Sequence, residues 1–153
     1  MLAKRSFLLA ALILAAGALL HVGVLAAGPE WIAFVGAPPE VVKSAELGTW
    51  LAPVSTLGIA ALLAVLALYA LAAAEKFRSL PLVKPVLWLF AAIFVLRGVI
   101  ILPALVQGQV NWAAPVDLFI IASSLAILVL GVALCLGLFG LRGSRQSPTG
   151  PRP

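Results

Sequence analysis

The sequence predicts an all-α fold, a four-helix bundle that crosses a membrane. Hydrophobic residues make up 64% of the chain and charged residues only 10%, and the mean hydropathy is +1.22. Soluble domains contain about 45–50% apolar and about 25% charged residues, so a water-soluble fold of this composition would lack the polar groups to cover its surface. The length of 153 residues fits a single domain.

Four apolar segments are each long enough to cross about 30 Å of hydrocarbon at about 1.5 Å per residue. They define a transmembrane domain over residues 1–142 and lie at 6–27, 51–74, 85–106 and 115–141. The remaining residues, 143–153, are rich in Pro, Ser, Gly and Arg, and we expect them to form a disordered cytoplasmic tail.

Residues 1–27 have a second interpretation, as a secretory signal peptide. A basic start precedes the apolar stretch, and small residues follow at Ala26 and Ala27. However, the apolar stretch continues past His21 and is long enough to span the membrane. We therefore predict that this segment is retained as the first transmembrane helix.

The basic residues are divided unequally between the two ends of the predicted spans. Eight lie on one side, the opposite connections contain only Lys43, and Arg97 lies within the third span. By the positive-inside rule, this asymmetry predicts that both termini are cytoplasmic, in a bacterial inner membrane, and it argues against dual topology. The eight residues are Lys4, Arg5, Lys76, Arg78, Lys84, Arg142, Arg145 and Arg152.

The longest connection, 28–50, is expected on the outer side. Residues 40–47 follow Pro39 and precede Gly48, and we predict that they form a short helix. Proline is common at the start of a helix, and glycine is common just after its end. We expect the preceding apolar residues to lie flat at the membrane interface. These are Trp31, Ile32, Phe34 and Val35.

Arg97 lies about 15 Å from one predicted surface and about 18 Å from the other, close to the bilayer centre. An arginine there costs about 2.5–3.5 kcal/mol on insertion scales, so its side chain is expected to have a partner. Three interpretations stay open: pairing with an internal carboxylate or a freed backbone carbonyl that only fixes packing, contact with an anionic ligand, and extension towards a surface. Asp117 is the carboxylate nearest the interior of a span. It pairs with Arg97, stabilises the start of its helix, or does both.

Small and polar residues recur at helical spacing in three spans, as is usual where helices pack in lipid. His21 shares a face with Gly17, and Asp117, Ser124 and Gly131 follow one another at intervals of seven. A similar stripe in the second span contains Thr56, Ala60, Ala67 and Ala74.

If these stripes meet on the face that carries Arg97, they would form a polar pocket in the outer half of the bundle. Its binding residues would be Arg97, Asp117, His21, Ser124 and Thr56. His21 has two further interpretations, a packed imidazole that is hydrogen-bonded to a neighbouring helix and a pH sensor. Pro103 lacks an N–H, so we also expect a kink in the third span beyond Arg97.

Several local patterns resemble one known family of membrane proteins. They are His21, Gly28–Trp31, Gly36, Gly48–Trp50, Leu68–Leu71, Leu80–Leu82 and Leu96–Gly98. They resemble a family of small bacterial inner-membrane proteins with four spans and unknown activity. The resemblance covers roughly residues 15–100. It implies four retained spans and no particular chemistry.

The composition favours a non-enzymatic protein with a structural, accessory or regulatory role. One Cys, one His and five carboxylates provide no disulfide, no metal cage and no catalytic residues, and we expect no cofactor. The alternative is binding or transport of a small anionic solute or lipid through the pocket around Arg97. The expected partners are the lipid bilayer and either other membrane proteins or further copies of the chain. Nucleic acid is not expected, because the basic residues lie at membrane edges rather than in one patch.

Overall fold

The computed structural model describes residues 1–143, with side chains as far as Leu141. This part of the chain is all-helical, and four of its segments are long and apolar enough to cross a membrane. They are α1, α4, α5 together with α6, and α7 as far as Leu141. The predicted fold class with four spans is therefore confirmed. The helices are α1 (Leu2–Ala27), α2 (Pro29–Phe34), α3 (Pro39–Glu46), α4 (Leu51–Ala73), α5 (Val83–Val99), α6 (Leu102–Val106) and α7 (Pro115–Gly143).

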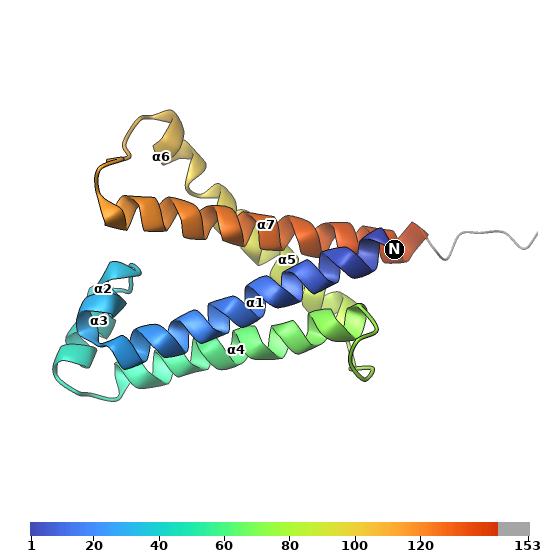
Figure 1. Cartoon of the computed structure of the whole chain (residues 1–153), viewed down its shortest axis with the longest axis horizontal. Coiled ribbons are helices and arrows are strands. Elements are labelled where there is room, and N and C mark those ends of the chain that lie inside the picture. Colours follow the sequence, from blue (N-terminus) through green and yellow to red (C-terminus); the bar gives the residue numbers. More distant parts are fainter. Residues whose placement is uncertain (144–153) are drawn as a thin grey trace, which may run out of the picture.

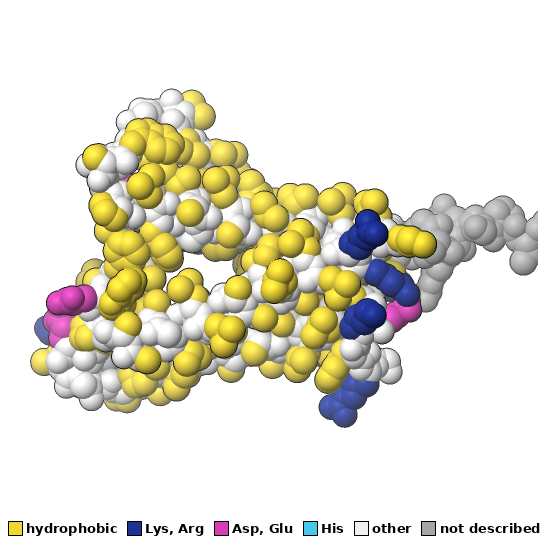
Figure 2. Space-filling view, viewed as in Figure 1, with side chains coloured by type: hydrophobic (Ala, Val, Ile, Leu, Met, Phe, Trp, Pro, Cys, Tyr) yellow, Lys and Arg dark blue, Asp and Glu magenta, His cyan; other side chains and the backbone are white. Residues whose placement is uncertain are grey.

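The long helices form two antiparallel pairs, α1 with α4 and α5 with α7, and the pairs are joined where α1 packs against α7 (Figure 1). The pairs converge at the end that holds the N-terminus, the connection 74–82 and the end of α7. We call this the basic end, because Lys and Arg side chains gather there (Figure 2). The opposite end, which we call the loop end, holds the connections 28–50 and 107–114. The predicted separation of charge between the two ends is thus present in the fold.

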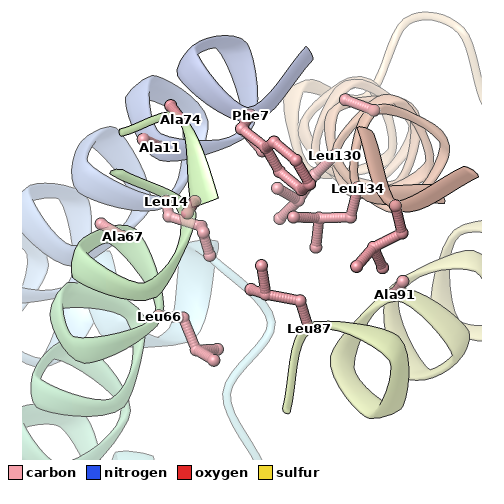
Figure 3. Close-up of a cluster of buried hydrophobic side chains, with 14 residues drawn as sticks. Phe7, Ala11, Leu14, Leu66, Ala67, Ala74, Leu87, Ala91, Leu130 and Leu134 are labelled. Atoms are coloured by element: carbon pink, nitrogen blue, oxygen red, sulfur yellow. The ribbon is translucent and has the colours of Figure 1, made fainter. Parts of the chain in front are cut away.

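The main hydrophobic core lies in the half of the bundle next to the basic end. Figure 3 shows side chains from α1, α4, α5 and α7 meeting there. Glycines in α7 allow α1 to approach closely: a Cβ at Gly137 would lie 2.7 Å from the ring of Phe7, and one at Gly140 would lie 2.8 Å from Cβ of Ala3. The largest buried side chains of this core are Phe7, Leu14, Leu66, Leu87, Leu134 and Leu138.

A second, smaller core occupies the loop end. Ile32 of α2 is buried against Val24 of α1 and Ala52 of α4, and apolar side chains of α3 pack around them. Of the four residues expected to lie flat at the interface, Ile32 instead turns its side chain into the fold. A short helix is present close to the predicted position, at Pro39–Glu46.

The regular helix of the third span is interrupted before Pro103. α5 ends at Val99, Ile100 and Ile101 form a turn that keeps right-handed helical backbone angles, and α6 begins at Leu102 with Pro103 in its first turn. Proline has no N–H to continue the helix, and its ring clashes with the preceding turn. The kink expected at Pro103 takes the form of a short interruption between α5 and α6. Gly143 ends α7, and the rest of the predicted tail, 144–153, lies outside the described residues.

Candidate functional site

The helices α5 and α7 cross at very short range. A Cβ at Gly98 would lie 2.6 Å from Cβ of Leu128, and one at Gly131 would lie 2.7 Å from the backbone nitrogen of Val95. Real Cβ atoms do not approach so closely, so this crossing requires glycine at both positions. Gly131 thus lies in a helix–helix contact, as its stripe predicted. The two contacts also fix the antiparallel register of the pair.

Arg97 precedes Gly98 and is turned about 100° away from it around the helix axis. Its side chain is exposed, and in residues 1–143 it makes no ion pair or hydrogen bond. It borders an exposed apolar stripe, which we call the α5 face. The α5 face consists of Arg97 with Leu89, Ile93, Leu96 and Ile100.

The third span is the least covered of the four. Only 11% of its most apolar 18-residue stretch is buried, compared with 28% in α1, 28% in α4 and 33% in α7. The reason is that α5 packs mainly against α7 and contacts α4 only weakly. The α5 face is therefore left without a neighbour among the described helices.

The unbroken helix α7 gives the depth of Arg97. The register between Gly98 and Leu128 places Arg97 at the level of Val129. Val129 is about 21 Å along α7 from Pro115 and about 18 Å from Leu141, at about 1.5 Å per residue. Arg97 therefore lies midway between the two ends of the span, as the sequence predicted.

Asp117 does not meet Arg97. Its Oδ2 accepts a hydrogen bond from the backbone N–H of Asn111 at 2.8 Å, in the connection before α7. Asp117 also lies in the first turn of α7, where a carboxylate interacts favourably with the helix dipole. Along α7 it is about 18 Å from the level of Arg97. The interpretation as a residue that stabilises the helix start fits this geometry, and the expected ion pair is not formed.

His21 and Thr56 belong to the other helix pair. His21 Nδ1 lies 2.8 Å from the carbonyl oxygen of Gly17, one turn earlier in its own helix, so the hydrogen bond is not to a neighbouring helix as expected. Gly17 itself faces Leu63 of α4. The predicted stripe of α4 is buried at all four positions, Thr56, Ala60, Ala67 and Ala74.

Ser124 is fully buried in α7, and its Oγ has no hydrogen-bond partner in the described part of the chain. Continuing the register from Leu128 by one turn places Ser124 at the level of the break between α5 and α6. The side chain fills an interior position and does not open onto a pocket.

The five candidate residues thus do not form one site. His21 and Thr56 lie in the α1–α4 pair, whereas Asp117 and Ser124 lie in α7 and Arg97 lies on the α5 face. Towards the loop end the two pairs diverge, and Figure 2 shows an opening between them bordered by hydrophobic side chains. The stripes of α1, α4 and α7 therefore do not converge on the face of α5 that carries Arg97.

Sequence reasoning missed Gly98 and Ser44 as positioning residues. Ser44 belongs to α3, and its side chain contacts the first turn of α4. Its Oγ accepts a hydrogen bond from the backbone N–H of Ala52 at 2.9 Å and lies 2.7 Å from Oγ1 of Thr49. This contact ties the long connection to the bundle. Gly98 could have been identified from its small size, because small residues in membrane helices usually lie where another helix packs closely.

The four long apolar helices define the class as a multi-pass membrane protein. In residues 1–143, no group of three His, Cys, Asp or Glu side chains could hold a metal ion. Neither a family model, nor a curated protein, nor a solved structure matches the chain.

Proposed function

We propose that this protein is a non-enzymatic accessory component of a bacterial inner membrane, with both termini in the cytoplasm, which works by assembling with other transmembrane helices. The α5 face is the surface through which it assembles. The connection 28–50 packs against α1 and α4, and the other connections of the described chain are short, so the membrane-embedded surface is the largest area available to a partner.

The observation that carries this proposal is the uncovered guanidinium of Arg97 at mid-depth. A charged side chain in the middle of a membrane almost always faces protein or a water-filled cavity, because exposure to lipid costs several kcal/mol. Here the side chain is exposed, and it has no ion-pair or hydrogen-bond partner in the described part of the chain. A partner that packs on the α5 face removes this cost, and the surrounding leucine and isoleucine side chains provide the apolar contact.

The alternative of an anionic solute or lipid finds less support in the geometry. The polar residues that were expected to form its pocket lie on separate helix pairs, and the opening between the pairs is bordered by hydrophobic side chains (Figure 2). Arg97 alone could contact an anion, but a headgroup at a membrane surface is far from its depth.

Site-specific photocrosslinking in native membranes tests the proposal. A photoreactive amino acid is placed at Leu96 on the α5 face, and the matched control carries it at Leu12 of α1, because the two side chains are equally exposed at 69% and 68%. We expect a discrete protein adduct from Leu96 and none from Leu12. If Leu96 crosslinks only to lipid, or if both positions give the same adducts, the proposed assembly role is wrong.

A further inference from the structure

We infer that the helix that covers the α5 face belongs to a different protein and carries an Asp or Glu near the middle of the membrane. This inference rests on the proposed assembly role and specifies the chemistry of the partner. It follows from the depth of Arg97 and from the positions of the five carboxylates in the chain.

The charge of Arg97 selects the chemistry of the partner. Guanidinium forms its strongest contacts with a carboxylate or phosphate, through two parallel N–H···O hydrogen bonds. Phosphate in a membrane lies at the headgroups, whereas an arginine side chain reaches only about 7 Å from its Cα. Since Arg97 lies about 18 Å or more from either end of the span, a lipid phosphate is out of range. A side-chain carboxylate within the hydrocarbon region is left as the counter-ion.

A second copy of the chain cannot supply that carboxylate. Glu75 lies at the basic end, and the remaining three glutamates lie in the connection 28–50 at the loop end. Asp117 is the nearest in depth, and it is still about 18 Å from the level of Arg97. In a parallel dimer through the α5 face, the two guanidinium groups would approach each other instead.

Inverting the second copy does not change this result. Arg97 lies midway along the span, so in an antiparallel dimer Asp117 would lie about equally far away, on the other side of the membrane centre. The partner must therefore bring a carboxylate that this chain does not have at mid-depth.

The apolar part of the α5 face indicates that the partner packs on it as a helix. Leu89, Ile93, Leu96 and Ile100 follow at spacings of four, three and four, which is the pattern of one helix face that packs along another. Arg97 borders this stripe beside Ile93 and Ile100. A helix that packs along the stripe would therefore hold its carboxylate within reach of the guanidinium.

Synthetic transmembrane peptides test the inference directly. The probes are polyleucine helices with a single central Glu, a single central Gln, or a Glu moved two turns towards one end. Each is labelled with a fluorophore and mixed with the labelled full-length protein in phosphatidylcholine vesicles, and association is measured by energy transfer. We expect the central-Glu peptide to bind at least about tenfold more tightly than the other two, which corresponds to about 1.4 kcal/mol.

Variants of the protein locate the effect. Arg97→Leu should abolish the preference for central Glu, and Arg97→Lys should retain only part of it, because lysine keeps the charge but cannot form two parallel hydrogen bonds with a carboxylate. The control Leu12→Arg in the Arg97→Leu background places the charge on an exposed face of α1, and it should not restore the preference. Equal binding of all three peptides to the wild-type protein overturns the inference, as does a preference that persists in Arg97→Leu.

The crosslinking experiment separates this inference from the proposed function. An adduct at Leu96 with twice the mass of the chain would be a dimer of this protein. It would support the proposed assembly role and contradict the inference that the partner is a different protein. An adduct with another protein that persists unchanged in Arg97→Leu keeps the assembly role and overturns the carboxylate. Loss of every protein adduct at Leu96 in the wild-type chain overturns the proposed function itself.

Discussion

Gly98 lies against Leu128 with no room for a side chain, and this contact determines where the neighbouring Arg97 points. A Cβ at Gly98 would lie 2.6 Å from Cβ of Leu128 and 2.7 Å from its Cα. The helix α5 can therefore pack on α7 at this distance only with Gly98 facing inwards. Consecutive residues in a helix are turned by about 100°, so Arg97 is carried away from the interface.

Gly98→Ala should separate α5 from α7. Because the clash involves the backbone of Leu128, no side-chain rotation can relieve it, and we expect a loss of about 1–3 kcal/mol in the free energy of unfolding. Unfolding of the detergent-solubilised protein by increasing SDS, followed by circular dichroism, measures this. The control is Gly58→Ala in α4, where a Cβ meets nothing within 4 Å, and the change should stay within about 0.5 kcal/mol. Equal effects at the two positions would show that the close crossing does not exist.

Ser124→Ala should leave the stability unchanged or raise it by about 1 kcal/mol. The hydroxyl is buried without a hydrogen-bond partner in the described chain, so its removal eliminates an unsatisfied polar group. Ser123→Ala is the comparison, because Oγ of Ser123 donates a hydrogen bond to the carbonyl of Ile120 at 3.0 Å. The same SDS titration applies. A loss of more than about 1 kcal/mol at Ser124 would mean that its hydroxyl is hydrogen-bonded in the membrane.

Ser44→Ala should destabilise the loop end. Its Oγ accepts the buried N–H of Ala52, and without this acceptor the N–H is left unsatisfied, at a cost of about 1–3 kcal/mol. Hydrogen exchange at residues 39–55 should become faster while exchange in the main core stays unchanged. Ser55→Ala is the control, because Oγ of Ser55 bonds only to carbonyls of its own helix, at Leu51 and Ala52. Unchanged exchange in Ser44→Ala would contradict this role.

The orientation in the membrane can be read from single cysteines. In a Cys135→Ala background, Gln109→Cys reports on the loop end and Ser79→Cys on the basic end, and both positions are exposed. If both termini are cytoplasmic, a membrane-impermeant maleimide should label Gln109→Cys in intact cells and should label Ser79→Cys only after permeabilisation. The reverse pattern would invert the predicted topology.

The long apolar runs could be read directly from the sequence, because a bilayer imposes both length and composition on every helix that crosses it. The break near Pro103 was equally predictable, since proline acts on its own backbone. The separation of charge between the ends also follows from residue order alone. These features depend on local sequence and do not require knowledge of which helices are neighbours.

The sequence did not allow us to predict which helices pack together and which faces they use. The pocket around Arg97 assumed that three polar stripes converge on the face of the third span that carries Arg97, whereas the structure forms two helix pairs that separate towards the loop end. Gly98 and Gly131 lie at the close crossing of α5 and α7, and with Gly98 facing α7 the neighbouring Arg97 faces away from it. The burial of Ile32 could not be predicted for a similar reason, because the second core contains side chains of α1, α3 and α4 as well as α2.

The divergence of the two helix pairs makes the molecule wider at the loop end than at the basic end (Figure 1). The pairs are held together by the core near the basic end, and at the loop end Phe34 of α2 contacts Phe119 of α7 across the opening, with ring centroids 5.3 Å apart. A body of this tapered shape relieves bending stress in a bilayer that is convex on the wide side. We therefore expect the protein to concentrate in strongly curved regions. Vesicles of about 30 nm should take up more protein per unit area than flat bilayers of the same lipids, and equal uptake would show that the taper closes in the membrane.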